Sequence, residues 1–293
     1  RTRFLVVRPG ALGDTILALP LLSSVQGQHP DSVVTLLGNR AYQELLPPGI
    51  EFCAIDDPSQ LWIFSGENVE LDPTIPVYER AYVILERPAD VIRNLRRARI
   101  ESIRHVGSRP PAGTHVVKHL HCGLGLPVPS PAPALKHLAP SEKKDLIWIH
   151  PGSGGRKKCL PLELMAFLSE SLTTKTGWDL AITLGEADEF LKKLPGWKRL
   201  VQTHVQLFEN RPLKEICREL GRAKLFVGND SGMAHLAAGL GIRGTVFYVS
   251  TDPVQWAPWV REGEVRVMDL RGRQASRPEL EQEVLAAINQ DPN

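Results

Sequence analysis

Two α/β domains, each a mainly parallel β-sheet flanked by helices, are the fold class that this sequence predicts. Short apolar runs alternate with helix-like segments, as in parallel sheets whose strands are joined by crossover helices. At 293 residues the chain is long for one hydrophobic core. A Pro-rich stretch, LGLPVPSPAPALKHLAPS, interrupts the alternation and is typical of an interdomain linker. We therefore expect one domain at 1–138 and a second at 139–293.

The first domain begins with the apolar run FLVV, which we expect to form a buried strand before a helix that carries Asp14. Strands and helices then alternate up to the linker, apart from a polar, Pro-containing stretch at about 56–76. The expected strands span residues 4–7, 32–38, 50–55, 81–86 and 102–107. The expected helices include TILALPLL, AYQELL and DVIRNLRRARI.

The alternation restarts in the second domain with the apolar run DLIWIHPG. Further strands are expected at DLAITLG, near LVQTH, and at KLFVGND, GTVFYV and EVRVMDL. The expected helices are LELMAFLSESLTTKT, ADEFLKKL, LKEICREL, MAHLAAGLG and PELEQEVLAAINQ. The last of these helices is a candidate to pack back on the first domain.

Composition and charge exclude several classes of protein. The net charge is only +2, which gives no reason to expect nucleic acid as the main partner. The four cysteines form no C-x-x-C pair, which argues against a zinc site or a disulfide framework and fits a reducing compartment. The apolar runs are far shorter than the ~20 residues that cross a bilayer. We expect a cytoplasmic enzyme or binding protein.

The stretch VGNDSGMAHLAAGLG follows the strand KLFV, at an edge of the sheet where such domains bind ligands. Asp230 or Ser231 can cap the helix, and the N–H groups of Ser231, Gly232 and Met233 would then form an anion site. An ordinary helix cap is the alternative interpretation. For His235, one turn into the helix, a place in the core is the alternative to a role in the site.

Two more loops follow strands of the second domain. IHPGSGGRKKCLP combines a glycine-rich backbone with three consecutive cations, which favours phosphate contact over a solvated basic turn. It lacks the G-K-[ST] of a Walker loop. LGEADE carries carboxylates that can accept hydrogen bonds from ribose hydroxyls, although a surface acid in a helix's first turn is the stronger interpretation.

Asp14 lies in the turn RPGALGD, where its charge would repel a phosphate. If the second domain holds a diphosphate, Asp14 would face the cleft from the opposite wall and suit a general base on an attacking hydroxyl. A cap for the helix TILALPLL is the alternative.

Arginines are frequent in residues 93–109. Two interpretations of this stretch are a solvated helix face and a docking surface for an anionic acceptor or membrane headgroups. Arg93 and Arg97, with Gly13 beside Asp14, are the candidates for acceptor contact. The arginines concerned are Arg93, Arg96, Arg97, Arg99, Arg104 and Arg109.

Together and in this order, these motifs resemble those of the ADP-heptose:lipopolysaccharide heptosyltransferase family, glycosyltransferase family 9. ALGDTILALP is similar to the family's opening turn, HPGSGGRKKCLP to its H-P-G loop, and GEADE to its G-x-x-x-E. GNDSGMAHLAAGLG, followed by STDPVQWAPW, is similar to its most specific signature. The resemblance spans nearly the whole chain and implies two facing Rossmann-like domains, the GT-B architecture.

The resemblance also implies a role for single residues. Asp14 would take the proton from the acceptor hydroxyl. Lys158 and Ser153 would contact the donor phosphates, and Glu189 would hold the ribose or orient the donor. Asp230 would contact the donor sugar.

In the same family pattern, Ser231, Gly232 and Met233 would cradle the diphosphate, and His235 would support their turn. The implied activity is inverting transfer of a sugar, expected to be heptose from ADP-heptose, to a lipopolysaccharide core or related glycan, with no metal, cofactor or covalent intermediate. The expected partners are this donor, a glycolipid or glycan acceptor and a peripheral contact on the cytoplasmic face of the inner membrane, without nucleic acid.

Two other functions remain open at this point. One is a nucleotide-sugar epimerase or hydrolase on the same scaffold, and the other is a non-catalytic nucleotide-sugar binding protein. The sequence departs from the family pattern at Leu160, where Trp is usual, and at Val249 and Ser250, which replace a Gly-Pro pair. These departures concern the sugar and the acceptor more than the diphosphate site.

Overall fold

A computed structural model describes residues 1–66, 71, 75–201 and 205–288. The chain divides into two compact units, Arg1–Ser130 and Pro131–Asn293. The predicted boundary at 138/139 lies further along the chain than this division. The N–H of Leu135 donates to the carbonyl of Gly239 at 2.8 Å, and the Leu135 side chain is buried. Part of the Pro-rich stretch therefore packs with the second unit.

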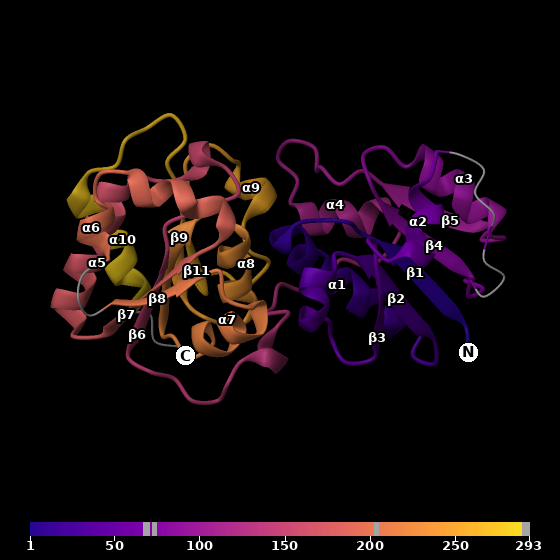
Figure 1. Cartoon of the computed structure of the whole chain (residues 1–293), viewed down its shortest axis with the longest axis horizontal. Helices are drawn as coiled ribbons and strands as arrows, with labels where there is room; N and C mark the ends of the chain where they lie inside the picture. The colour runs from indigo at the N-terminus through magenta and orange to yellow at the C-terminus, as the bar shows by residue number, and fades with distance from the viewer. Residues whose placement is uncertain (67–70, 72–74, 202–204, 289–293) are drawn as a thin grey trace. The chain divides into compact units, whose positions relative to one another are not determined.

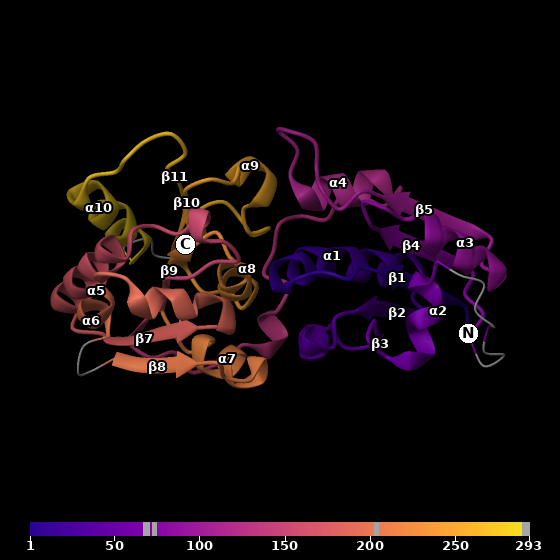
Figure 2. The same ribbon diagram turned by 45° about the horizontal axis from the view of Figure 1, so that its top comes forward.

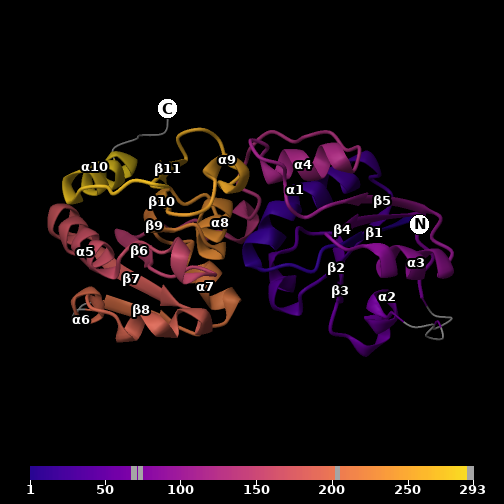
Figure 3. The same ribbon diagram turned by 90° about the horizontal axis from the view of Figure 1, so that it is seen from above.

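The first unit is a five-stranded parallel sheet in the order β3-β2-β1-β4-β5. Its helices cover both faces, with α1 and α4 on one and α2 and α3 on the other (Figure 3). Helix α4 is not among the elements expected from the sequence. The strands are β1 (Arg3–Val7), β2 (Val33–Gly38), β3 (Ile50–Ala54), β4 (Arg80–Ile84) and β5 (Ser102–Val106). The helices are α1 (Leu12–Gln28), α2 (Leu61–Phe64), α3 (Ala89–Arg97) and α4 (Val116–Gly123).

The second unit is a six-stranded parallel sheet in the order β11-β10-β9-β6-β7-β8. Figure 2 shows β7 and β8 running side by side in the same direction. Figure 1 labels helices and strands and colours them by their position along the chain. The strands are β6 (Leu146–His150), β7 (Asp179–Leu184), β8 (Val205–Glu209), β9 (Leu225–Asn229), β10 (Gly244–Tyr248) and β11 (Val265–Asp269). The helices are α5 (Leu162–Thr176), α6 (Trp197–Leu200), α7 (Leu213–Leu220), α8 (Gly232–Gly239), α9 (Pro253–Trp256) and α10 (Arg277–Ile288).

Helices cover both faces of this sheet too, with α5 and α10 on one and α7 and α8 on the other (Figure 3). The residues of β6, β9 and β10 are all buried, which explains why these strands are continuous apolar runs in the sequence. Leu280 and Val284 of α10 join the core of this same unit. Both sheets have the strand order of Rossmann-like folds, so the predicted fold class is confirmed.

Three expected elements differ in detail. The helices expected at AYQELL and ADEFLKKL are present, as 3₁₀ helices at Arg40–Leu45 and Glu186–Lys193. Pro47 and Pro195 follow shortly after these segments, which leaves little length for the cooperative α form. The strand expected near LVQTH begins at Val205, and residues 202–204 of that prediction lie outside the described residues. Within the described ranges, no helix combines the length and apolar character needed to cross a membrane.

Candidate functional site

The strand order reverses direction between β6 and β9 in the second unit, and ligands of such sheets bind beside the carboxyl ends of the strands at this point. The Gly-rich loop follows β6, and the stretch that begins at Asp230 follows β9. Asn229, fully buried, joins the two: its Nδ2 donates to the carbonyl of Pro151 at 2.8 Å, and its Oδ1 accepts from the N–H of Leu160 at 3.0 Å. Asn229 therefore holds both ends of the Gly-rich loop.

Asp230 brings three predicted site residues together. Lys158 Nζ donates to Asp230 Oδ2 at 2.9 Å, and Ser153 Oγ donates to the Asp230 backbone carbonyl at 2.5 Å. Thr251, which the sequence analysis did not single out, donates its hydroxyl to the same Asp230 Oδ2 at 2.5 Å. The Asp230 carboxylate is 5% exposed and the Lys158 side chain 35%. Hydrogen bonds from three side chains thus fix Asp230, while the Lys158 ammonium remains accessible to a ligand.

The first turn of α8 begins beside this carboxylate. Of the two residues predicted to cap it, Ser231 is the cap, and its Oγ accepts from the N–H of Ala234 at 3.3 Å. The N–H groups of Gly232 and Met233 belong to the first turn, where amides have no carbonyl partner within the helix. His235 is buried in the same turn. This end of the helix therefore offers amide donors and the positive end of its dipole next to Lys158.

Of the three acids in LGEADE, the adjacent Asp188 and Glu189 differ in burial. Glu189 has a side chain that is 51% exposed and pairs with Lys192 at 3.1 Å. Asp188 is buried, and its Oδ2 accepts from the N–H of Gly185 at 2.9 Å. A Cβ on Gly152 would lie 2.0 Å from Asp188 Oδ1, so the Gly-rich loop passes directly over this carboxylate. Glu189 is the acid expected in the site, whereas Asp188, which was not expected there, packs beneath the Gly-rich loop.

His150, at the end of β6, faces the same buried acid. One ring nitrogen, Nδ1, lies 3.1 Å from the carbonyl of Thr183, and Nε2 lies 3.8 Å from Asp188 Oδ2. Burial lowers the pKa of His150, and the Asp188 charge opposes that shift. We infer that the imidazole is neutral at pH 7 and donates from Nδ1 to Thr183.

This burial predicts an acid-sensitive contribution to stability. The folded pKa of His150 is below 6.5, the ordinary value, so the unfolded chain binds more protons as the pH falls through that value. The stabilisation is present above about pH 7 and is lost toward pH 5, with a slope of at most about 1.4 kcal/mol per pH unit. We expect His150→Gln to flatten the fall of the urea midpoint between these pH values. His137→Gln, at an exposed histidine, should leave the slope unchanged; equal slopes in all three proteins would contradict the prediction.

Asp14 lies in the first turn of α1, after the carboxyl end of β1. Its Oδ2 accepts at 3.1 Å from the N–H of Ala11, the N-cap residue of α1, as the acid at the third helical position of a capping box does. Its Oδ1 accepts from Arg8 Nη2 at 2.8 Å. The carboxylate is still 35% exposed. A Cβ on Gly10 would lie 2.6 Å from that of Asp14, so the turn needs glycine there. Arg8 stands in the same motif but is not among the site residues expected from the sequence.

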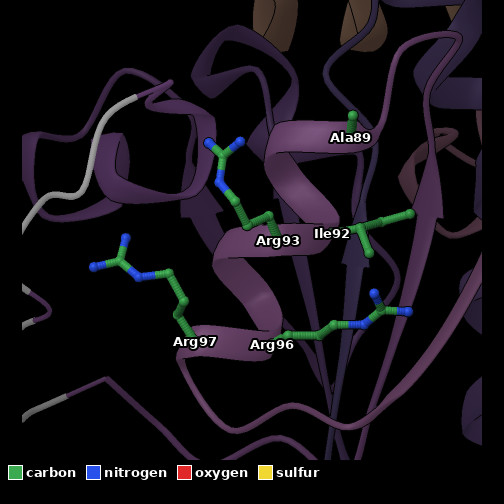
Figure 4. Close-up of a pocket in the computed structure, with 5 residues that line it drawn as sticks. All are labelled: Ala89, Ile92, Arg93, Arg96 and Arg97. Atoms are coloured by element: carbon green, nitrogen blue, oxygen red, sulfur yellow. The ribbon is translucent and has the colours of Figure 1, made fainter.

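The predicted acceptor-side arginines lie on α3, which starts after β4 and returns toward the amino edge of the sheet. Arg93 Nη2 donates to the carbonyls of Ser65 and Gly66, both at 3.2 Å. Figure 4 shows Arg93 and Arg97 pointing to one side of α3, and Ile92 and Arg96 to the other. These residues line a pocket of about 590 Å³. The fold carries Arg97 away from the carboxyl edge at which Asp14 lies, while Gly13 is adjacent to Asp14.

Across the described ranges, no three His, Cys, Asp or Glu side chains are grouped so that they could hold a metal ion. In the second unit, the Lys158 ammonium and the first amides of α8 are available to a bound molecule. In the first unit, the Asp14 carboxylate is partly exposed.

Comparisons with known proteins place this geometry in context. The model of glycosyltransferase family 9 (heptosyltransferase) matches residues 120–284. Comparison with curated proteins gives no match. Among solved structures, E. coli heptosyltransferase WaaC with ADP is 17% identical at a TM-score of 0.70, over 96% of this chain and 98% of that one. E. coli ADP-heptose LPS heptosyltransferase II is 17% identical at a TM-score of 0.72, over 98% of each chain.

A different enzyme class has a similar fold. A putative UDP-N-acetylglucosamine 2-epimerase from Listeria monocytogenes is 13% identical at a TM-score of 0.54, over 99% of this chain and 88% of that one. At such identities these likenesses show the fold, the GT-B fold of the heptosyltransferase structures.

Proposed function

Since this chain belongs to glycosyltransferase family 9 and is a glycosyltransferase, we propose that it transfers heptose from ADP-heptose to a lipopolysaccharide core or a related glycan. Transfer would invert the anomeric centre and need no metal ion. One observation carries the donor assignment: the accessible Lys158 ammonium and the first amides of α8 converge at the reversal of strand order. This grouping is complementary to a diphosphate.

The names of the similar structures support the choice of donor. WaaC was solved with ADP and with ADP-2-deoxy-2-fluoro heptose, and the dodecameric heptosyltransferase TibC with ADP-D-beta-D-heptose. On this basis we propose that the donor of this chain also contains adenine and heptose.

Each donor-side residue takes a role in this scheme. Lys158 and the amides of Ser231, Gly232 and Met233 stabilise the charge that develops on the departing diphosphate. Asp230, held by Lys158 and Thr251, contacts the donor sugar. Further donor-side roles fall to Ser153 on the phosphates, Glu189 on the ribose and His235 beneath the turn.

On the acceptor side, Asp14 is the base that removes the proton of the attacking hydroxyl, and Gly13 lies next to it. Arg93 and Arg97 remain proposed contacts for the anionic part of the acceptor or for membrane headgroups. We further propose that the enzyme works in the cytoplasm, in peripheral contact with the inner membrane that carries its acceptor.

A thermal-shift panel of ADP-, UDP- and GDP-sugars tests the donor. A ligand at about 100 times its Kd adds roughly 2.7 kcal/mol to the stability of the folded state. We expect ADP-heptose to raise the melting temperature and the UDP- and GDP-sugars to leave it unchanged. An equal shift with all three nucleotides, or none with any, would overturn the donor assignment.

Transfer is tested by ADP release from ADP-heptose with and without a heptose-free lipopolysaccharide core. We expect release that depends on the acceptor, with a heptosylated product. Turnover of the donor without acceptor would instead indicate an epimerase or hydrolase, for which the epimerase-like fold is a precedent. Donor binding with no turnover would indicate a binding protein.

A further inference from the structure

Two side chains donate hydrogen bonds to the same oxygen of Asp230. Lys158 Nζ lies 2.9 Å from Asp230 Oδ2, and the Thr251 hydroxyl lies 2.5 Å from the same atom. The side chain of Asp230 is 5% exposed, so water has almost no access to the carboxylate. A buried carboxylate is tolerated only when donors or cations compensate its charge. The lysine and the threonine therefore compensate one buried charge together.

The backbone of Asp230 is fixed at both of its polar groups. Its N–H donates to the carbonyl of Phe247 at 3.0 Å, and its carbonyl accepts from Ser153 Oγ at 2.5 Å. Lys158, in contrast, carries its ammonium on a flexible four-carbon stem, and its side chain is 35% exposed. An anion that draws the ammonium toward solvent therefore separates it from Asp230, because the acid cannot move with it.

Thr251 is positioned by strand β10 and helix α9, not by the Gly-rich loop. β10 pairs with β9, so the register brings the residues after β10 beside those after β9. The next residue, Asp252, caps α9 by accepting from the N–H of Val254 at 3.1 Å, and it forms an ion pair with Arg271 at 3.2 Å. The Thr251 hydroxyl therefore keeps its place when the lysine moves.

We propose that Thr251 is a positioning residue for donor binding. Its hydroxyl keeps the Asp230 carboxylate compensated and in place when Lys158 leaves it for the donor diphosphate. The inference rests on the proposed function, in which Lys158 binds that diphosphate. Thr251 needs no contact with the donor and acts only through Asp230 and Lys158.

The shared oxygen is the physical reason for this role. In the free protein, the ion pair with Asp230 competes with an anionic ligand for the Lys158 ammonium. Because Thr251 donates to the same Oδ2, that oxygen keeps a hydrogen bond after the lysine has turned away. Without the hydroxyl, donor binding would leave a buried charge with one donor fewer. The threonine thus makes the transfer of the lysine from acid to diphosphate less unfavourable.

The test measures ADP affinity by titration calorimetry in wild type, Thr251→Val and Thr251→Ser. ADP has the diphosphate but no heptose, so a contact between Asp230 and the sugar does not enter the measurement. Valine has the shape of threonine without the hydroxyl, and serine keeps the hydroxyl. We expect Thr251→Val to bind ADP roughly tenfold more weakly than wild type, as the loss of a hydrogen bond to a charged group implies. Thr251→Ser should bind within about twofold of wild type.

Thr245→Val is the matched control for this substitution. Thr245 lies on β10, is fully buried, and its hydroxyl has no hydrogen-bond partner among the described residues. Removing that hydroxyl should leave ADP affinity at the wild-type value. Melting temperatures without ligand show that each variant is folded.

Asp230→Asn separates charge compensation from packing. Asparagine has nearly the same shape as aspartate but no charge, so no buried charge is left when Lys158 moves. We expect Thr251→Val to change ADP affinity by about twofold or less when Asp230→Asn is already present. An equal tenfold loss in both backgrounds would mean that the valine disturbs the loop, which would overturn the inference.

The remaining outcomes distinguish this inference from the proposed function. Wild-type ADP affinity in Thr251→Val, or equally weak binding by Thr251→Ser, would remove the role of Thr251; with Lys158→Met weakened in the same assay, the diphosphate site would stand. Wild-type ADP affinity in Lys158→Met would remove the proposed diphosphate site and this inference with it.

Discussion

Replacing Asp14 by asparagine lowers the rate of sugar transfer by a factor of about 10²–10⁴, the usual contribution of a general base. The amide of Asp14→Asn can still accept the hydrogen bond from the Ala11 N–H, so α1 keeps its cap. It has no negative charge and cannot take up the acceptor's proton. Because the donor is proposed to bind the other unit, the shift of melting temperature with ADP-heptose should be the same as in wild type. The measurements are kcat for transfer and the donor thermal shift.

Two comparisons make this result specific. Asp31→Asn, at an exposed acid just beyond α1, should transfer sugar at the wild-type rate. Asp14→Asn should also remain folded, because the asparagine oxygen still accepts from the Ala11 N–H at the start of α1. If the variant transfers sugar normally, Asp14 is only the cap of α1, the interpretation that the local sequence favours.

Replacing Lys158 by methionine weakens donor binding and slows transfer together. A hydrogen bond to a charged group contributes about 1.5–3 kcal/mol, so the affinity for ADP-heptose should fall roughly 10- to 150-fold. The lysine also stabilises the negative charge that grows on the leaving diphosphate. We therefore expect kcat/KM to fall by a further factor of about 10²–10³, in addition to the loss in affinity for ADP-heptose. Donor titration calorimetry and steady-state transfer measure the two effects separately.

Lys157 provides the matched control for this variant. It is the neighbouring residue in the same loop and is exposed, and the described structure gives it no contact with Asp230. Lys157→Met should therefore bind and transfer like wild type. Equal losses of donor affinity and transfer rate in both variants would mean that the loop acts only through its overall positive charge. The ion pair between Lys158 and Asp230 would then have no specific role in function. Donor affinity unchanged in Lys158→Met would count against the diphosphate site itself.

Much of the fold was predictable from the sequence, because each element depends on residues close together in the chain. The apolar runs at β6, β9 and β10 are buried on both sides, as continuous apolar strands of a parallel sheet should be. The helix expected at ADEFLKKL is present too, but its type was not predictable: it is a 3₁₀ helix that ends shortly before Pro195.

The site was predictable only in part. The motifs correctly located the loops after β1, β6 and β9, since a Gly-rich turn after a strand is a local signal. They did not show which acid of LGEADE turns inward. Asp188 and Glu189 are adjacent and point to different sides of a tight helix, and the side that is buried depends on where the Gly152 loop passes.

By itself, the sequence determined the two parallel sheets, the loops at their carboxyl edges and the presence of Asp14, Lys158 and Asp230 in those loops. Only the tertiary structure decided the partners: Thr251 and Lys158 on Asp230, and Arg8 on the second oxygen of Asp14. The reason is physical. Turns and strands are set by interactions between near neighbours, whereas the charges that share a buried site are brought together by strand order and register across the sheet.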